Sequence, residues 1–383
     1  MLRFLTAGES HGPELTVIVD GVPAGITIDA ARDIDPDLRR RQGGHGRGKR
    51  QQIEHDVARI TAGVRGGRTL GSPIAITVVN RDWDNWKGPM QVEAEGFTKK
   101  TVTRVRPGHA DLAGMLKYDL DDARDVLERA SARETAARVA AGAVARAVLG
   151  VAGIRVSSHV VRIGDVVGGD PPARAADVES SPVRCADLEA SARMVAAIDA
   201  ARRAGDTLGG TAVVTGHGVV AGLGSYAQWD RRLDGRIAQA LCSIQSVKGV
   251  EIGDAVAAAA SRGSAVHDRP AFSAEAGFRH LSNRQGGLSG GVSNGEDVWA
   301  RVHFKPISTL LTPLRSVDAH TGEETNAHYE RSDICVVPAG AVVAEAMLAL
   351  VLADAVLEKF GGDSATELGR NIDGYRATLG RLR

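Results

Sequence analysis

The sequence predicts an α+β protein, and three observations support that fold class. Runs rich in valine and isoleucine and bounded by turn residues indicate β-strands, whereas alanine-rich runs indicate helices. Apolar and polar residues alternate in several of the expected strands, as in antiparallel strands with one buried face. At 383 residues, with 43% hydrophobic and 25% charged residues, the chain has the composition of a soluble globular protein with a large core.

The expected strands lie near residues 15–19, 74–79, 154–163, 211–220 and 298–304. The last of them shows the alternation clearly, because Arg301 and His303 are interleaved with Val302 and Phe304. We find no tandem repeat, low-complexity linker or break in composition. We therefore expect residues 1–383 to fold as one domain.

Two alanine-rich segments predict long helices. Residues 133–149 are strong helix formers, and Ser131 followed by Glu134 has the spacing of a capping box. Residues 189–204 form the second segment, and Gly205 is well placed to end it. Helices of this length need a buried face, so we expect them to pack against the strands.

A third helix is expected in the most apolar part of the chain. Pro338 suits the first helical residue, and Gly361 ends the pattern. Glu345 and Asp354 interrupt the apolar run, which favours a buried core helix over a membrane span. The apolar run at the N-terminus is too short for a signal peptide, so we expect a cytoplasmic protein.

Charge and cysteine content narrow the class of partner. The 47 basic and 47 acidic residues give zero formal net charge, which argues against binding nucleic acid or a membrane surface through a wide positive field. An anionic partner should therefore be small and bound in a pocket. Cys185, Cys242 and Cys335 form no CxxC pair, so we expect reduced thiols, and the histidine and cysteine spacing predicts no metal site.

The most unusual segment is a basic, glycine-rich stretch at residues 39–50. It holds the cations and glycines Arg39, Arg40, Arg41, Arg47, Lys49, Arg50, Gly43, Gly44, Gly46 and Gly48. The spacing nearly fits a nucleotide phosphate loop, but Arg50 stands where serine or threonine should bind magnesium. An RNA-binding segment and a solvated surface loop are further alternatives. We favour a mobile loop that closes over a small, multiply charged anion, because guanidinium groups match carboxylates and phosphates.

A short motif near the N-terminus, Gly-Glu-Ser-His-Gly at residues 8–12, presents a histidine. Its spacing fits the nucleophile elbow of hydrolases, but an elbow needs a helix after it. Pro13 and an expected strand follow instead. The motif is then either a surface turn or a turn that presents His11, a residue able to titrate near neutral pH.

The start of the first long helix carries a charge conflict. Arg133 falls in the first turn, where a cation opposes the helix dipole, and this suggests a bound anion. Ser131 and the free backbone N–H groups would donate to the same anion. The alternative, given equal weight, is that Arg129 and Arg133 pair with Glu128 and Glu134 on a solvated face.

Together with residues 106–109, 283–295, 305–309 and 331–333, these segments resemble the chorismate synthase family over nearly the full chain. The motifs that carry the resemblance are GESHG at 8–12, RQGGHGRG at 41–48, RPGHAD at 106–111, ERASARET at 128–135, GGLSGG at 286–291, KPIST at 305–309 and RSD at 331–333. The resemblance implies a β-α-β sandwich, with long helices between two antiparallel four-stranded sheets. It also implies a single catalytic domain, a homotetramer and an anti 1,4-elimination of phosphate from 5-enolpyruvylshikimate 3-phosphate that yields chorismate and requires reduced FMN.

The resemblance also implies which residues bind the two ligands. The phosphate and the two carboxylates of the substrate would be bound by Arg41, Arg47, Arg50, Arg133 and Arg331, of which Arg41 and Arg47 also match positions assigned to NADPH. FMN would be held by Arg129, Ala130, Ser131, Gln245, Ser246, Gly290, Lys305, Pro306, Ile307, Ser308, Thr309 and Arg331. A different alignment of the loop glycines would put Arg40 in place of Arg41.

Three residues would be catalytic by the same resemblance. His11 and His109 match two proton donors, one toward the leaving phosphate and one toward the flavin. Asp333 would support removal of the ring proton by positioning the flavin nitrogen that receives it. His45 stands where relatives often carry tyrosine, and we interpret it as a ring that packs on the loop.

Two functions other than this elimination stay open. The first is that of an oxidoreductase dependent on FMN and NADPH, which would use the same cofactors. It is also open whether this chain reduces its own flavin or depends on an external flavin reductase. A protein that binds RNA or small anions through residues 39–50 would instead show salt-sensitive binding and no requirement for FMN.

Overall fold

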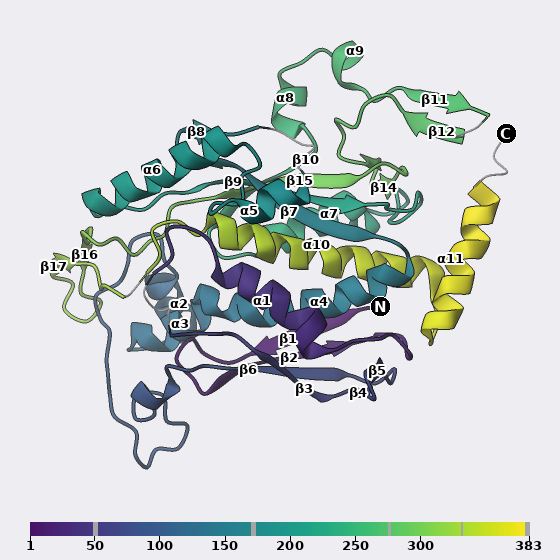
Figure 1. Ribbon diagram of the computed structural model, residues 1–383. Coiled ribbons are helices and arrows are strands. Elements are labelled where there is room, and N and C mark those ends of the chain that lie inside the picture. The colour runs from purple at the N-terminus through teal and green to yellow at the C-terminus, as the bar shows by residue number, and fades with distance from the viewer. Residues whose placement is uncertain (49–52, 170–173, 275–276, 331, 380–383) are drawn as a thin grey trace.

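Two antiparallel β-sheets enclose a layer of helices (Figure 1). The computed structural model describes residues 1–48, 53–169, 174–274, 277–330 and 332–379. The first sheet, in the lower part of Figure 1, has four strands in the order β1, β2, β6, β3. Its strands are β1 (Arg3–Ala7), β2 (Glu14–Asp20), β6 (Ile74–Val79) and β3 (Ala58–Ala62).

The second sheet has five strands in the order β10, β15, β9, β7, β8. They are β10 (Val247–Ile252), β15 (Val298–Phe304), β9 (Gly210–His217), β7 (Arg155–Ile163) and β8 (Val166–Val167). The expectation of four strands is wrong for this sheet. The chain turns back after β7 at Gly164, whose φ of 57° suits glycine, and adds the short β8 at the edge.

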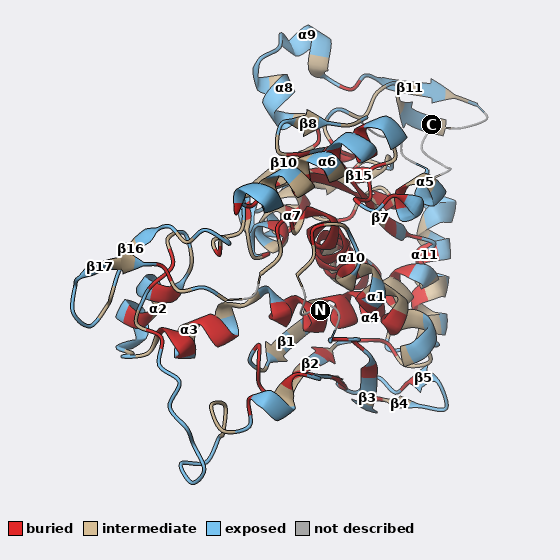
Figure 2. Cartoon of the chain, turned by 60° about the vertical axis from the view of Figure 1, so that its left-hand side comes forward, coloured by how far each residue is buried: buried red, intermediate tan, exposed pale blue. Residues whose placement is uncertain are grey.

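Helices α4 (Thr135–Val151) and α10 (Val337–Phe360) form the centre of the helix layer, where Figure 2 shows the densest burial. They approach closely, because a Cβ added to Gly142 of α4 would lie 2.4 Å from the Cβ of Ala346 on α10. A larger residue at position 142 would force the helices apart. α10 is long and apolar enough to cross a membrane, but 89% of its most apolar stretch is buried inside the molecule. The prediction of a buried core helix is therefore confirmed.

Shorter elements surround these three layers. The other helices are α1 (Asp35–Gln42), α2 (Asp111–Tyr118), α3 (Ala123–Ala130), α5 (Ala175–Ser180), α6 (Leu188–Ala204), α7 (Leu233–Cys242), α8 (Ala255–Ala259), α9 (Gly263–Val266) and α11 (Ala365–Leu379). The two-stranded hairpins are β4 (Val64–Arg65) with β5 (Arg68–Thr69), β11 (Pro270–Ser273) with β12 (Gly277–His280), β13 (Leu288–Ser289) with β14 (Val292–Ser293), and β16 (Arg315–Val317) with β17 (Glu324–Asn326). A π-helical turn (Ala30–Ile34) precedes α1, and 3-10 turns occupy Trp83–Asn85, Ala132–Glu134 and Trp229–Arg231.

The expected strands are all present, as β2, β6, β7, β9 and β15, and buried residues alternate with partly exposed ones along β15. The capping box is wrong in detail, because a 3-10 turn comes before α4. Ser131 Oγ accepts a hydrogen bond from the backbone N–H of Arg133 at 3.3 Å. The carboxylate of Glu134 turns away and binds Thr6 and Arg138.

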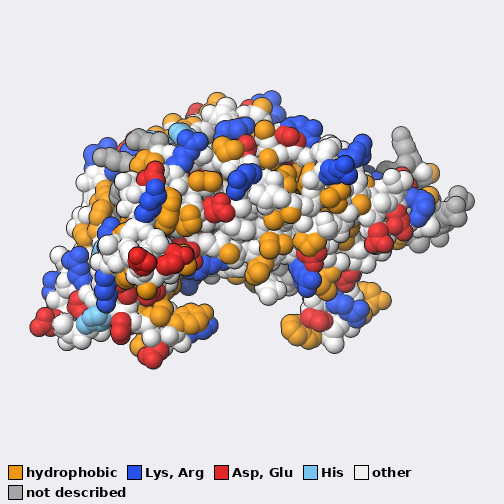
Figure 3. Space-filling view, turned by 90° about the horizontal axis from the view of Figure 1, so that it is seen from below, with side chains coloured by type: hydrophobic (Ala, Val, Ile, Leu, Met, Phe, Trp, Pro, Cys, Tyr) orange, Lys and Arg blue, Asp and Glu red, His pale blue; other side chains and the backbone are white. Residues whose placement is uncertain are grey.

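The surface carries both signs of charge. Figure 3 views the molecule from below the four-stranded sheet and shows acidic and basic side chains interspersed over that face. This mixture fits the zero formal net charge of the chain. Cys185, Cys242 and Cys335 are free thiols, as expected.

Candidate active site

Loops at one end of the helix layer enclose a cavity of about 360 Å³, a size suited to a small ligand. Its walls come from the β1–β2 turn, α1 and the chain after it, the turn before α2, the end of α3, the start of α4, the chain before β10, the end of β15 and the chain after it, and the start of α10 with the chain before it. Most of the predicted site residues line it: His11, Arg41, Arg47, His109, Ala130, Ser131, Arg133, Gln245, Ser246, Lys305, Ile307, Ser308, Thr309 and Asp333. Segments far apart in the sequence thus meet at one place.

Three predicted residues within the described ranges do not line the cavity. Arg129 donates to backbone carbonyls at the end of β1, at 2.9 and 3.1 Å, and so braces the β1–β2 turn from outside. Gly290 lies in the turn between β13 and β14, and Pro306 lies between two lining residues. Arg50 and Arg331 lie outside the described residues.

His11 lies in the β1–β2 turn and is held by a buried carboxylate. Its Nδ1 lies 2.9 and 3.0 Å from the two side-chain oxygens of Glu128, and its backbone N–H donates to the same carboxylate at 2.9 Å. The imidazole stacks on Trp86, with ring centroids 4.0 Å apart. Burial alone would raise the pKa of Glu128, but the hydrogen bond from His11 and the charge of Arg124 outweigh it and lower that pKa.

His109 occupies the turn before α2 and has the same kind of support. Its Nδ1 lies 2.5 Å from the carboxylate of Asp111, which Arg106 binds through Nε and Nη2 at 2.8 and 3.0 Å. Burial opposes ionisation, but the hydrogen bonds from His109 and Arg106 hold the pKa of Asp111 well below its usual range. Arg106 also donates to Thr309 at 3.1 Å, which ties this turn to the chain after β15.

Arg133 and Arg41 share one buried carboxylate. Nη1 of Arg133 lies 2.6 Å from one oxygen of Asp56, and Nη1 of Arg41 lies 3.3 Å from the other. Nη2 of Arg133 lies 3.6 Å from Glu54 and makes no hydrogen bond within the described part of the chain. Burial lowers the pKa of Arg41 to about 10, although Asp56 opposes this effect. The alternative that Arg133 pairs with Glu134 on a solvated face is therefore wrong.

Arg47 and Asp333 join the basic segment to the chain before α10. Nη1 of Arg47 lies 2.6 Å from one oxygen of Asp333, and the backbone N–H of Gly48 donates to the other at 2.6 Å. Nε of Arg47 is buried and has no hydrogen-bond partner among the described residues. Both oxygens of Asp333 thus hold the basic segment against the cavity wall.

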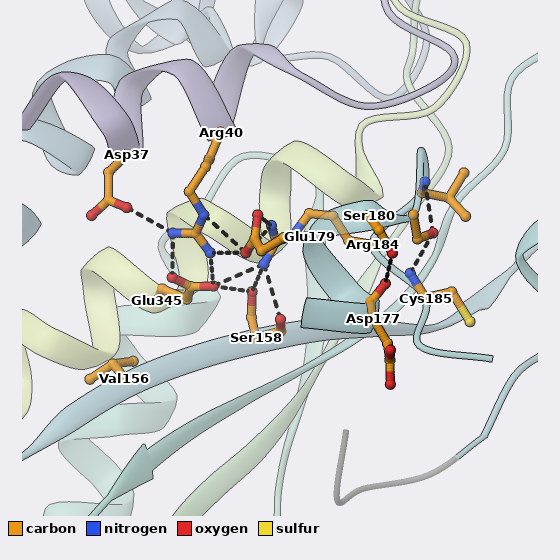
Figure 4. Close-up of polar contacts among 12 residues, drawn as sticks. Asp37, Arg40, Val156, Ser158, Asp177, Glu179, Ser180, Arg184, Cys185 and Glu345 are labelled. Carbon is orange, nitrogen blue, oxygen red and sulfur yellow. Dashed lines mark hydrogen bonds and ion pairs between the residues drawn. The ribbon is translucent and has the colours of Figure 1, made fainter. Parts of the chain in front are cut away.

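The structure separates Arg40 from Arg41. Arg41 lines the cavity, whereas Arg40 leaves α1 in another direction and binds three carboxylates (Figure 4). Its guanidinium lies 2.8 Å from Glu345, 2.9 Å from Glu179 and 2.7 Å from Asp37. Of the two alignments considered for the basic segment, the one with Arg41 at the site fits the structure.

The part of the lining that residues 244–246, 305 and 307–309 form, called here the polar wall, carries fewer charges than the part with the arginines. Lys305 Nζ donates to Ser308 Oγ at 2.8 Å, and Ser308 in turn donates to the carbonyl of Gly108 at 2.8 Å. Burial lowers the pKa of Lys305. Gln245 donates to Glu134 at 3.2 Å, while its Oε1 is buried and accepts no hydrogen bond from the residues described.

Three interpretations of motifs can be judged from their surroundings. Residues 8–12 connect two antiparallel strands, so no helix follows Ser10 and the nucleophile elbow is excluded. Helix α1, and not a strand, precedes Gly43, which excludes the nucleotide phosphate loop. His45 does not line the cavity, and its Nε2 lies 2.8 Å from Asp199 at the loop edge.

Several residues that complete the site received no role from the sequence: Glu54, Asp56, Trp86, Arg106, Asp111, Arg124 and Glu128. A faint signal existed for Glu128, which follows Arg124 by four residues, the spacing of an ion pair on a helix. Asp56 and Arg133 have no such signal, because tertiary folding alone brings them together. Among the described residues, no group of histidine, cysteine and acidic residues could hold a metal ion.

Comparisons with known proteins agree with this geometry. Residues 2–357 match a family model described as chorismate synthase. The chorismate synthase of Desulforudis audaxviator is 56% identical, with 100% of this chain and 98% of the relative covered, and that of Moorella thermoacetica is 56% identical, with 99% of each covered. A crystal structure of chorismate synthase matches with a TM-score of 0.80 at 40% identity, over 100% of this chain and 99% of that chain.

Proposed function

The chain belongs to the chorismate synthase family, and on this premise we propose that the cavity described above is its catalytic site. Enzymes of this family are lyases that eliminate phosphate from 5-enolpyruvylshikimate 3-phosphate to give chorismate, in the biosynthesis of aromatic amino acids. One observation carries the proposal. The cavity gathers His11, His109, Arg41, Arg47 and Arg133 from four separate parts of the sequence.

We assign the phosphate and the two carboxylates of the substrate to Arg41, Arg47 and Arg133. Nη2 of Arg133 and Nε of Arg47 are buried donors that make no hydrogen bond within the described ranges. Such donors have already lost their water, so a bound anion would restore hydrogen bonds that folding removed. Arg50 and Arg331 complete the proposed set on the family pattern alone.

His11 and His109 are the proposed proton donors. A carboxylate holds Nδ1 of each ring, so Nε2 is the atom that would exchange a proton with a ligand. One histidine would protonate the phosphate as its C–O bond breaks, which lowers the charge of the leaving group. The other would act toward the flavin. Asp333 would support removal of the ring proton, in addition to its contacts with Arg47 and Gly48.

The polar wall has groups that fit FMN. Gln245 Oε1 is a buried acceptor that no described residue satisfies, and the imide N–H of a flavin ring is a donor of matching chemistry. Lys305, Ser131, Ser308 and Thr309 offer a cation and hydroxyl groups for a phosphate. When bound, reduced FMN would supply transient electron density to an elimination that has no net redox change.

The remaining assignments rest on the family pattern. NADPH, bound by Arg41 and Arg47, would supply reducing equivalents if the chain reduces its own flavin, and an external flavin reductase would supply them otherwise. Ala130, Ser246 and Ile307 would complete the flavin contacts, with Arg129, Pro306 and Gly290 as predicted contacts that do not line the cavity. We propose that residues 1–383 act as one catalytic domain within a cytoplasmic homotetramer.

The direct test is anaerobic incubation of the protein with 5-enolpyruvylshikimate 3-phosphate and chemically reduced FMN. We expect chorismate and inorganic phosphate in equal amounts, and neither product with oxidised FMN. Absence of both products with reduced FMN would overturn the proposal. An oxidoreductase would instead consume NADPH without releasing phosphate. NADPH consumption in air with added FMN and no reductase would identify a chain that reduces its own flavin.

A further inference from the structure

The carboxylate of Glu128, on α3, contacts both the backbone N–H and the ring of His11. We propose that Glu128 is a positioning residue for His11, which keeps a proton on Nδ1 and directs Nε2 toward the cavity. The inference rests on the proposed function of His11 as a proton donor. Three observations carry it, namely the geometry of the contact, the charge of the carboxylate and the stacking of Trp86.

The geometry fixes both the backbone and the ring of His11. The backbone carbonyl of Glu128 accepts from the N–H of Ser10 at 2.9 Å, and its carboxylate accepts from the N–H of His11 at 2.9 Å. The same carboxylate has its two oxygens 2.9 and 3.0 Å from Nδ1 of the ring. One residue on a helix therefore sets both the position of the turn and the direction of the imidazole.

The charge of Glu128 decides which ring nitrogen carries hydrogen. Arg124 donates to the carboxylate at 2.9 Å, and the side chain of Glu128 is 2% exposed. The hydrogen bond from His11 and the positive charge of Arg124 outweigh burial and lower the pKa of Glu128. An ionised carboxylate has no proton to give and can only accept, so Nδ1 of His11 must be the donor. In the neutral ring, Nε2 is then the nitrogen without hydrogen, so His11 can donate a proton to a ligand only after Nε2 has itself taken one up.

Trp86 limits the remaining freedom of the ring. The indole is 6% exposed and stacks on the imidazole with an interplanar angle of 23°. Its Nε1 donates to Asp82 at 3.3 Å, and Lys100 Nζ lies 3.8 Å from the centroid of its ring. Rotation of the His11 ring out of this plane would break the stacking, and a half-turn about its Cβ–Cγ bond, which keeps the plane, would lose the bond to Glu128. The tautomer and the direction of Nε2 are therefore fixed by separate contacts.

The chain offers a matched control outside the cavity. On the five-stranded sheet, Nε2 of His303 lies 2.7 Å from the carboxylate of Glu251, and neither residue lines the cavity. The side chain of His303 is 38% exposed, so this pair borders solvent. Replacement of Glu251 removes the carboxylate partner of His303, just as replacement of Glu128 removes that of His11, but we expect it to leave the reaction unchanged.

The first test measures the tautomer directly in the wild-type protein. ¹⁵N NMR of protein labelled at histidine distinguishes protonated from bare ring nitrogens, and the His11→Asn variant identifies the signals of His11. At neutral pH we expect a protonated Nδ1 in His11. A bare Nδ1 with a proton on Nε2 would overturn the proposal. The measurement requires neither FMN nor substrate, so it stands even if the chorismate assay fails.

The second test compares turnover among variants. Glu128→Gln keeps the size of the side chain but loses the charge that forces Nδ1 to donate. We expect kcat to fall about 10–100-fold, by analogy with the loss when the carboxylate that orients a metal-bound histidine is removed. KM should change little, because Glu128 is assigned no substrate contact. Glu128→Asp keeps the charge and should retain the Nδ1–H signal and recover part of kcat. Glu251→Gln should match the wild type.

Two results in this series would overturn the proposal. One is an unchanged kcat in Glu128→Gln, and the other is a rise in KM with kcat unaffected, which would indicate a substrate contact. If Glu128→Gln does not fold, the Glu128→Asp variant and the wild-type spectrum still decide the question. Loss of activity in Glu251→Gln would mean that kcat does not report on His11.

Discussion

Helix α1 sends two neighbouring arginines into two different buried polar clusters. Arg40 enters the Glu345 cluster, which comprises Asp37, Arg40, Arg146, Ser158, Glu179, Arg184 and Glu345. Figure 4 labels all of these residues except Arg146. Arg41 enters the pocket cluster, which comprises Arg41, Arg47, Glu54, Asp56, Arg133 and Asp333. Both clusters pair arginines with carboxylates of the chain itself. They differ in their position, because the arginines of the second cluster line the cavity whereas the residues of the first do not.

This difference changes how clustered cations in a sequence should be interpreted. A run of arginines need not wait for an external anion, because Arg40, Arg41 and Arg47 each have a carboxylate partner within the described residues. The role of a buried arginine–carboxylate pair depends on whether its arginine also lines a cavity. A buried pair that faces other helices and strands holds the fold together, and a buried pair that faces a cavity keeps its cations in place until a ligand arrives.

Substitution of the two histidines that line the cavity should change kcat more than any other substitution considered, without a comparable change in substrate affinity or stability. His11→Ala and His109→Ala should each lower kcat about 10²–10⁴-fold, the usual contribution of a general acid, with substrate binding largely kept. Steady-state kinetics with reduced FMN measures both. His303→Ala, which removes a histidine with a carboxylate partner outside the cavity, is the control and should retain activity. Normal turnover in either cavity variant would remove that histidine from the mechanism.

The Glu345 cluster should show the opposite behaviour. Glu345→Gln removes the carboxylate that three arginines surround, and breaking a buried ion pair in this way costs about 3–5 kcal/mol of unfolding free energy. Denaturant unfolding measures the loss, while kcat of the folded protein should stay unchanged. Glu179→Gln is the matched control, because Glu179 is 45% exposed and its loss should cost less than about 1 kcal/mol. A fall in kcat without a loss of stability would contradict the division of roles.

A smaller effect follows from pH. Burial would raise the pKa of Glu345, but the charges of Arg146 and Arg40 outweigh it and lower the pKa below its ordinary value of 4.5. A lowered pKa in the folded state contributes stability above pH 4.5, and this stability is lost as pH falls through the folded pKa. The difference in unfolding free energy between the wild type and Glu345→Gln should therefore shrink below about pH 4.5. A difference that stays constant down to pH 3 would argue against an ionised Glu345.

Much of the fold could be predicted from the sequence, because strands and long helices leave local patterns. The strands β2, β6, β7, β9 and β15 and the helices α4, α6 and α10 were all expected from such patterns. The strand β8 was not, since two residues after a glycine turn carry no period. Likewise, the position of Arg133 at the start of a helix predicted a bound anion, but in the structure its guanidinium lies next to the carboxylates of Asp56 and Glu54.

The candidate site was predictable where a residue's chemistry shows in its motif. His11, His109 and Arg47 were found this way and line the cavity. The partner of His11 was not, because Glu128 lies 117 positions away and contacts His11 through tertiary packing. Gly290 differs from these residues, since the family resemblance assigns it to the flavin and the structure places it in the turn between β13 and β14, where it does not line the cavity.

We propose that the pocket cluster, and not the Glu345 cluster, binds the substrate. Calorimetric titration of 5-enolpyruvylshikimate 3-phosphate into the protein loaded with FMN measures this binding. Arg47→Ala removes a charged hydrogen-bond donor and should raise Kd about 10–100-fold. Glu345→Gln should bind with the wild-type Kd. Equal affinities for Arg47→Ala and the wild type would show that the pocket cluster does not bind the substrate through Arg47.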